Sequence, residues 1–207
     1  MAGSGQRMKI NKNKILLDLY GKPIFMHSLD LFKSYDFEIV CVINENDKDE
    51  VIPYLNGIKY VVGGKTRKES VYNGLKAISG DYVIIHDAAR PLLSRKVLDN
   101  ILSIYKDSDA ILTYHPCKNT IKLIENNKLK TLNRDNLINA LTPQCAKYDL
   151  LYNAYKKSFE DNKEFTDDIS LIEYYYSDKK IDLVLGNDEL IKVTTLIDYK
   201  LLKSLKE

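Results

Sequence analysis

The sequence lacks tryptophan, and it has only three cysteines, five prolines and no apolar run long enough to cross a membrane. Its cysteines, Cys41, Cys117 and Cys145, form no CxxC pair and leave one thiol unpaired under any pairing scheme. This argues against a disulfide-stabilised scaffold and favours reduced thiols in a cytoplasmic protein. The sequence also lacks an excess of one charge, since 31 basic residues face 29 acidic ones. We therefore expect no nucleic-acid or membrane partner, and any affinity for phosphate must be local.

Short apolar runs typical of β-strands alternate with amphipathic stretches along the chain. This alternation predicts an α/β fold with a single doubly wound, mostly parallel sheet of Rossmann-like arrangement. With 207 residues, 44% of them hydrophobic, we expect one domain that spans residues 1–207. The predicted strands are 38–43, 58–62, 81–85, 110–114, 181–185 and 190–194, and the predicted helices are 23–35, 147–159 and 167–176, with others beginning near 66, 94 and 196.

Residues 119–132 interrupt the alternation. Two stretches of alternating residues flank the polar turn Glu125-Asn126-Asn127, which predicts a β-hairpin. A two-stranded hairpin is only marginally stable by itself. We therefore expect residues 115–135 to form a protruding arm that packs on a second subunit of a homodimer.

The first phosphate-binding candidate is the small-residue loop Gly3-Ser4-Gly5-Gln6-Arg7, followed by Lys14. Glycines let backbone N–H groups approach a polyphosphate closely, and Arg7 and Lys14 supply positive charge. A flexible N-terminal tail is the plain alternative, and such a loop alone is a weak signal.

The second candidate is the tract 63–70, Gly-Gly-Lys-Thr-Arg-Lys-Glu-Ser. Its glycines end a predicted strand, and Thr66 with Glu69 three residues later has the pattern of a capping box. Ligands bind at the carboxyl ends of strands in open α/β sheets, which makes this turn a candidate site. The alternative is a simple turn with Arg67 and Lys68 on a solvated face.

The third candidate, His86-Asp87-Ala88-Ala89-Arg90-Pro91, also follows a predicted strand. Asp87 is suited to a hydroxyl or a metal–phosphate complex, and Arg90 to an oxyanion. The alternative is that Asp87 caps the next segment and pairs with Arg90. His86 is interpreted as a packed core residue, and no zinc motif is present.

Later polar residues have plain explanations when each is taken separately. Thr166 is predicted to be a helix N-cap followed by acids that favour the helix dipole. Lys192 is consistent with an exposed strand residue. Arg134 and the tract Thr142-Pro143-Gln144 add further polar groups.

Taken in order from residue 2 to about 203, these segments resemble the 2-C-methyl-D-erythritol 4-phosphate cytidylyltransferase family of the non-mevalonate isoprenoid pathway. The resemblance implies transfer of a cytidylyl group from CTP to a polyol phosphate, methylerythritol phosphate, with release of pyrophosphate. Because two anions must meet, the enzyme would supply mainly positioning and positive charge. The resemblance also implies Mg²⁺, held mainly by the CTP phosphates, with Asp87 as the candidate protein ligand.

The site residues that the resemblance implies fall into three groups. The catalytic ones are Arg7, Lys14, Arg134 and Lys192. Those that would bind CTP are Ala2, Gly3, Gly5, Gly64, Lys65, Arg67, Ser70, Asp87 and Ala88. Those that would bind the acceptor are Arg90, Thr120, Thr142 and Thr166, and Thr120 and Arg134 would act from the arm of the partner subunit.

The sequence departs from the family at its start. In the family the glycine loop follows an apolar, central strand, whereas here Met1 stands where that strand has ended. We expect the first strand to be missing from this chain and to be encoded upstream. Two alternative functions remain open: ribitol-5-phosphate cytidylyltransferase, and a non-catalytic nucleotide-binding protein.

Overall fold

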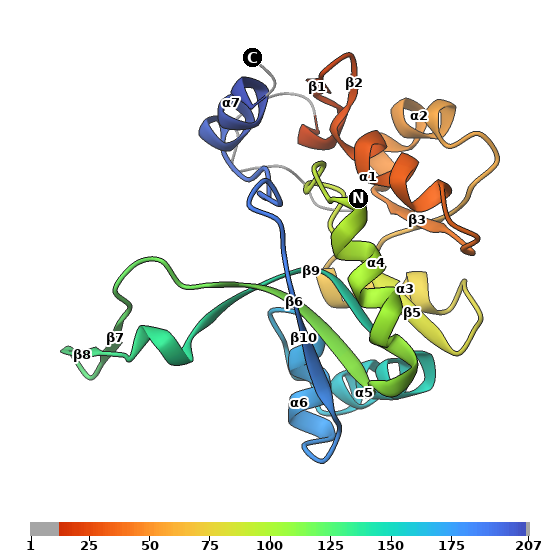
Figure 1. Cartoon of the computed structure of the whole chain (residues 1–207). Coiled ribbons are helices and arrows are strands. Elements are labelled where there is room, and N and C mark those ends of the chain that lie inside the picture. The colour runs from red at the N-terminus through yellow and green to blue at the C-terminus, as the bar shows by residue number, and fades with distance from the viewer. Residues whose placement is uncertain (1–12, 206–207) are drawn as a thin grey trace.

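The computed structural model describes residues 13–205. The predicted site residues Ala2, Gly3, Gly5 and Arg7 lie outside the described residues, as does the expected site of a first strand. The predicted α/β class is confirmed, because helices and strands alternate along most of the described chain. Figure 1 shows the strands at the centre, with helices around them and one hairpin projecting to the side.

Four strands form the largest sheet, in the order β10–β6–β9–β5. β6 pairs in parallel with β10, whereas β9 is antiparallel to both β6 and β5. β5, β6 and β10 therefore share one direction, and the sheet is mixed. A separate pair, β3 and β4, is parallel. The bounds are β3 Val40–Ile43, β4 Lys59–Val62, β5 Tyr82–Ile85, β6 Ala110–Pro116, β9 Ile138–Lys147 and β10 Ile181–Leu185.

Helices cover both faces of the largest sheet. On one face Leu75, Leu151 and Ile172 of α3, α5 and α6 share a buried cluster with Leu112 of β6. On the other face α4 packs against the neighbouring residue Ile111, because successive strand side chains point to opposite faces. The bounds are α1 Ile24–Lys33, α2 Lys48–Val51, α3 Arg67–Leu75, α4 Arg95–Ile104, α5 Tyr148–Glu160, α6 Ile169–Tyr175 and α7 Leu196–Ser204.

The hairpin of β7 (Lys122–Glu125) and β8 (Lys128–Thr131) projects from the body of the molecule (Figure 1). Asn126 and Asn127 make its turn with positive φ angles of 50° and 58°, a conformation that asparagine tolerates. All eight residues of β7 and β8 are exposed. We call residues 115–135 the arm, and its role in a dimer stays a prediction.

Three local predictions need correction. Residues 190–194 form no strand. Leu190 and Val193 are buried, but the Val193 amide donates its hydrogen bond to the carbonyl of Ala89, which lies in a turn and not in a neighbouring strand. Pro23 is not the first helical residue, because its extended backbone belongs to the short strand β2 (Lys22–Pro23) and α1 begins at Ile24. At α6, Asp167 rather than Thr166 accepts the Ser170 amide.

Three described strands were not predicted: the two-residue strands β1 (Asp18–Leu19) and β2, and the much longer β9. β9 spans ten residues, Ile138–Lys147, although it contains Pro143. Proline lacks the N–H that a strand ladder uses, so the sequence argues against a strand here. The register between β6 and β9 shifts between Leu112 and Tyr114, and this irregularity accommodates the segment around Pro143.

No helix in the range 13–205 is both long and apolar enough to cross a membrane.

The cysteines differ in accessibility, and we expect native chain to react rapidly with a thiol reagent at Cys117 alone. Cys41 and Cys145 are buried, and burial raises their thiol pKa values to about 11 and about 12. Cys117 is partly exposed. Titration with Ellman's reagent should count one fast thiol in buffer and all three in urea. Three fast thiols in buffer would contradict this packing.

Candidate functional site

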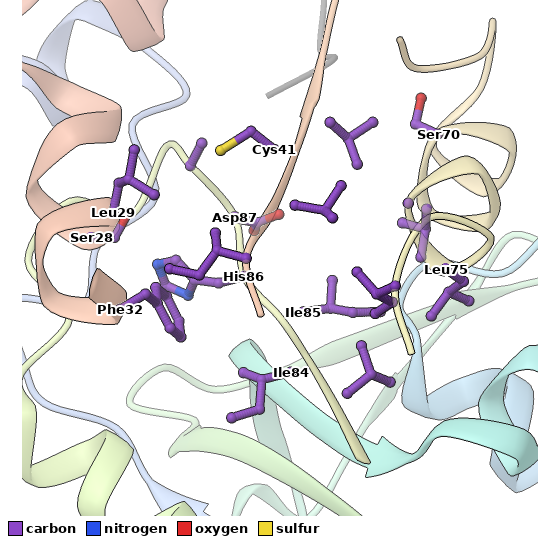
Figure 2. A pocket seen from close by; sticks show the side chains of 18 of the residues that line it. Ser28, Leu29, Phe32, Cys41, Ser70, Leu75, Ile84, Ile85, His86 and Asp87 are labelled. Atoms are coloured by element: carbon purple, nitrogen blue, oxygen red, sulfur yellow. The ribbon is translucent and has the colours of Figure 1, made fainter. Parts of the chain in front are cut away.

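Turns that follow β3, β4 and β5 border a cavity of about 1020 Å³. Figure 2 shows part of it, with Ser70 on α3 at one side and Asp87 after the end of β5. We call the part bordered by Lys14, Gly64, Asp87 and Lys192 the polar rim. The predicted site residues that line the cavity are Lys14, Gly64, Lys65, Arg67, Ser70, Asp87, Ala88 and Lys192.

Asp87 connects two cations at the polar rim. Its Oδ2 atom lies 2.9 Å from Lys192 Nζ and accepts a hydrogen bond of 3.3 Å from Arg90 Nε. Burial by itself would raise the pKa of Asp87, but Lys192 and Arg90 outweigh it and hold this pKa at about 2. Asp87 is therefore ionised at neutral pH, and it positions the ammonium group of Lys192. The Lys192 side chain is 41% exposed.

Arg90 and Thr142, predicted to bind the acceptor, lie behind Asp87 and do not line the cavity. Arg90 is buried, and its Nη1 atom donates to the Leu190 carbonyl at 2.9 Å. Thr142 Oγ1 accepts the Asp87 amide at 3.0 Å. In this geometry both residues hold the turn that carries Asp87, and Arg90 also fixes the segment before Lys192.

The turn after β4 is rigid for local reasons. Thr66 and Glu69 form the predicted capping box at the start of α3, which is thereby confirmed. Ser70 Oγ accepts the Gly64 amide at 3.1 Å and donates to the Thr66 carbonyl at 2.8 Å. A Cβ on Gly64 would lie 2.2 Å from Glu69 Cβ, so this close approach requires glycine.

Arg67 is anchored by a residue 101 positions away in the sequence. Its Nη1 and Nη2 atoms donate to the two carboxylate oxygens of the fully buried Asp168, and Tyr155 also donates to that carboxylate. Burial by itself would lower the pKa of Arg67, but Asp168 raises it above its usual value. Sequence reasoning missed this anchor because it interpreted Asp168 only as an acid near a helix start.

Three predicted acceptor or catalytic residues lie away from the polar rim. Thr166 is exposed in the loop before α6 and does not line the cavity. Thr120 and Arg134 are exposed on the arm, where Arg134 Nη1 donates to the Lys118 carbonyl at 2.8 Å. Figure 1 shows the arm directed away from α3 and β5. The described residues of one chain therefore do not bring these side chains to the cavity.

His86 supports the same turn as a neutral imidazole, in agreement with its interpretation as a packed residue. Its Nε2–H donates to the Arg90 carbonyl at 3.1 Å, which leaves Nδ1 to accept from the Thr142 hydroxyl at 3.2 Å. Burial lowers the pKa of His86 to about 4.

We expect the free energy of unfolding to fall as the pH decreases from about 6.5 to about 4 because of His86. The unfolded chain binds a proton at this residue near pH 6.5, whereas the folded chain binds it only near pH 4, so the loss reaches about 3 kcal/mol. Urea unfolding at several pH values measures the slope. In His86→Gln this contribution should vanish, and equal slopes for the parent and the variant would contradict it.

The described residues contain no group of three or more His, Cys, Asp or Glu side chains placed to hold a metal ion. Asp87 is the carboxylate at the polar rim, between Lys192 and Arg90.

The chain is similar along nearly its full length to proteins that share one description. A family profile described as 2-C-methyl-D-erythritol 4-phosphate cytidylyltransferase matches residues 1–205. A protein of that name from Fusobacterium nucleatum is 39% identical and aligns over 98% of this chain and 92% of its own length. A protein of the same name from Mannheimia succiniciproducens is also 39% identical, over 97% and 90%.

Solved structures agree with this. The crystal structure of 4-diphosphocytidyl-2C-methyl-D-erythritol synthase from Anaerococcus prevotii superposes with a TM-score of 0.89 at 30% identity, over 100% of this chain and 93% of that one. The corresponding cytidylyltransferase from Thermus thermophilus gives a TM-score of 0.82 at 26% identity, over 93% of each chain.

Proposed function

We propose that the polar rim is where the two substrates of this chain meet. The chain belongs to the 2-C-methyl-D-erythritol 4-phosphate cytidylyltransferase family. The chain is a nucleotidyltransferase of isoprenoid biosynthesis that transfers a cytidylyl group from CTP to 2-C-methyl-D-erythritol 4-phosphate. The ribitol-5-phosphate alternative is not favoured, since the relatives named above carry the methylerythritol name. The observation that carries the proposal is that Lys14, Asp87 and Lys192 border one cavity with the Gly64 turn.

The reaction joins two anions. A phosphate oxygen of the acceptor attacks the α-phosphorus of CTP, a new P–O bond forms, and the bond to the bridging oxygen breaks as pyrophosphate leaves. Positive charge fixed near the α-phosphorus lowers this barrier because charge grows there in the transition state. In our proposal Lys14, with Arg7 of the glycine loop, supplies that charge, and Ala2, Gly3 and Gly5 bind the triphosphate.

The turn after β4 would hold the nucleoside end of CTP. Gly64 and Ser70 have fixed geometry, and Lys65 lines the same cavity. Arg67 is already held by Asp168. This supports a role in which its fixed guanidinium group shapes the side of the cavity that would bind the nucleoside. Asp87 and Ala88 would lie between the nucleotide and the acceptor.

The acceptor phosphate would bind Lys192, whose ammonium Asp87 positions at the rim. Arg90 and Thr142 would act mainly through the turn that carries Asp87. We further propose a homodimer in which Thr120 and Arg134 of one arm complete the partner's site. The exposure of the arm and of its apolar tip residues Ile124 and Leu129, 73% and 71% exposed, supports this.

We propose Mg²⁺ as the cofactor. This ion keeps several waters and binds through one or two carboxylates together with substrate phosphates. An ionised Asp87 at the polar rim fits that donor set, so Asp87 and the CTP phosphates would hold the ion. Bound there, it would offset charge on the pyrophosphate leaving group. The cytoplasmic location predicted from the free thiols stays a prediction.

Pyrophosphate release tests the function. The chain is assayed with CTP, ATP or UTP, in each case with methylerythritol phosphate or ribitol 5-phosphate and with or without Mg²⁺. We expect release with CTP, methylerythritol phosphate and Mg²⁺ together. Equal release with ribitol 5-phosphate would favour the other acceptor, and saturable CTP binding without turnover would favour a non-catalytic nucleotide-binding protein.

A further inference from the structure

The two lysines of the polar rim come from opposite ends of the sequence, and neither lies in a strand of the largest sheet. Lys14 begins a short 3-10 helix (Lys14–Leu16), and Lys192 lies in the segment 190–194, which precedes α7 and forms no strand. Two ammonium groups at one rim repel each other. Contacts outside the sheet must therefore fix their separation.

The first of these contacts joins α7 to the hairpin of β1 and β2. Leu19 of β1 and Leu202 of α7 belong to one buried cluster. The Tyr199 hydroxyl of α7 donates a hydrogen bond to the carbonyl of Asp18 in β1, shortly after Lys14. Figure 1 shows α7 and this hairpin at the same end of the molecule. The start of α7 thus holds the segment that follows Lys14.

Asp198, the neighbour of Tyr199 in the first turn of α7, holds the backbone that follows Lys192. Its Oδ2 atom accepts hydrogen bonds from the amides of Thr194 and Thr195, at 2.9 and 2.7 Å. In return Thr195 Oγ1 accepts the Asp198 amide at 3.3 Å, which completes a capping box. Two neighbouring residues of α7 therefore hold the segments that carry the two lysines.

Asp198 also lies close enough to Lys14 for their charges to interact. Burial by itself would raise the pKa of Asp198, but hydrogen bonds from the Thr195 and Thr194 amides and the positive charge of Lys14 hold this pKa below its usual value. The carboxylate is therefore ionised at neutral pH, and it offsets part of the repulsion between Lys14 and Lys192. The two amide dipoles compensate part of its own charge, so that Lys14 still attracts an anionic substrate.

We propose that Asp198 and Tyr199 are positioning residues for the transfer reaction, which hold the Lys192 and Lys14 segments at a fixed separation. The inference rests on the proposed function for the roles of the two lysines. Neither Asp198 nor Tyr199 lines the cavity, so both act through the lysines and not by touching a substrate. In-line attack needs the reacting atoms about 3–3.5 Å apart, and a misplacement of about 1 Å can cost about 10²-fold in rate.

The alternative is that Asp198 serves only as part of a helix cap. A capping box stabilises a helix end, so this alternative predicts that any loss of activity follows the loss of stability. Thr195→Ala separates the two roles. It removes the hydroxyl half of the box, whereas Asp198 keeps its bonds to both backbone amides.

Pyrophosphate release by the 207-residue chain with CTP and methylerythritol phosphate tests the proposal. Asp198→Ala should lower kcat by about 10²-fold and Tyr199→Phe by about 3–10-fold, with both KM values within about threefold of the parent. Thr195→Ala should lower the melting temperature by about 2–4 °C and keep kcat within about twofold. Tyr175→Phe, which loses a hydroxyl bonded to Asp161 away from the cavity, is the matched control and should keep the parent's kcat.

Two kinetic outcomes would overturn the proposal. One is a kcat within about twofold of the parent in both Asp198→Ala and Tyr199→Phe. The other is a kcat that falls in proportion to the melting temperature across these two variants and Thr195→Ala, because Asp198 would then be a helix cap alone.

A second readout needs no catalysis. Asp198→Asn retains an oxygen for both amides but removes the charge near Lys14. Reductive methylation of the substrate-free chain should modify Lys14 about 3–10-fold faster in this variant, because an ammonium group loses its proton more readily without a carboxylate nearby. Lys22 should react at the parent's rate, and Asp178→Asn, which removes a carboxylate paired with Lys179, should leave Lys14 unchanged. An unchanged Lys14 rate in Asp198→Asn would overturn the proposal.

The two readouts distinguish this inference from the proposed function. A parent chain that releases no pyrophosphate would contradict the proposed function, and the methylation rate of Lys14 would still show whether Asp198 acts on it. A parent chain that turns over CTP, with Asp198→Ala and Tyr199→Phe equally active, would contradict the positioning role alone.

Discussion

Lys14→Ala is expected to lower kcat by about 10²–10³-fold, with a much smaller change in the KM values of CTP and methylerythritol phosphate. The reason is that charge grows on the α-phosphate in the transition state, so a cation fixed near it stabilises the transition state more than the bound substrates. Steady-state pyrophosphate release over both substrate concentrations separates the two parameters.

Lys22→Ala is the matched control for this variant, because Lys22 pairs with Asp30 on the surface and does not line the cavity. It should keep the parent's kinetics. If Lys14→Ala retained the parent's kcat, or lost activity only through a higher KM for CTP, Lys14 would be a binding residue and its assigned role would be wrong.

Lys192→Ala should lower kcat/KM for methylerythritol phosphate by about 10–100-fold while KM for CTP changes little, since a charge-assisted hydrogen bond to phosphate contributes about 1.5–3 kcal/mol. Two effects act together. The acceptor phosphate loses its cation, and Asp87 loses one of the two cations, Lys192 and Arg90, that together hold its pKa at about 2. Initial rates with acceptor varied at saturating CTP measure this change.

Lys179→Ala, which removes an ammonium paired with Asp178 away from the cavity, is the control for Lys192→Ala. An acceptor kcat/KM within twofold of the parent for both variants would exclude Lys192 from acceptor binding. A rise in KM for CTP alone would instead assign Lys192 to the nucleotide.

Local sequence signals predicted the parts of the site that depend on local structure. Thr66 and Glu69 stand three residues apart, and this spacing is sufficient for the capping box that fixes the turn after β4. Likewise the tract from His86 follows an apolar run, so its position at a strand end followed from the pattern. The local pattern therefore predicted that Gly64 and Asp87 lie just after strand ends.

Long-range partners were not predictable from the sequence in the same way. The residues near Arg67 give no sign of its partner Asp168, which lies 101 residues later. Asp168 accepts hydrogen bonds from both terminal nitrogens of Arg67. Strand direction is equally non-local, which is why β9 and its antiparallel pairing were missed. Residues 190–194 show the converse: Leu190 and Val193 are buried, as in a strand, but a hydrogen bond from Val193 to the Ala89 turn replaces a ladder.

The central claim is that the polar rim holds both phosphorylated substrates, with Lys14 on the CTP side and Lys192 on the acceptor side. Lysine footprinting by reductive methylation, read by mass spectrometry, tests it without catalysis. CTP with Mg²⁺ should slow the modification of Lys14 most strongly, and methylerythritol phosphate should slow that of Lys192, while Lys22 and Lys179 react at unchanged rates. Unchanged modification of both Lys14 and Lys192 at saturating substrate would contradict the account.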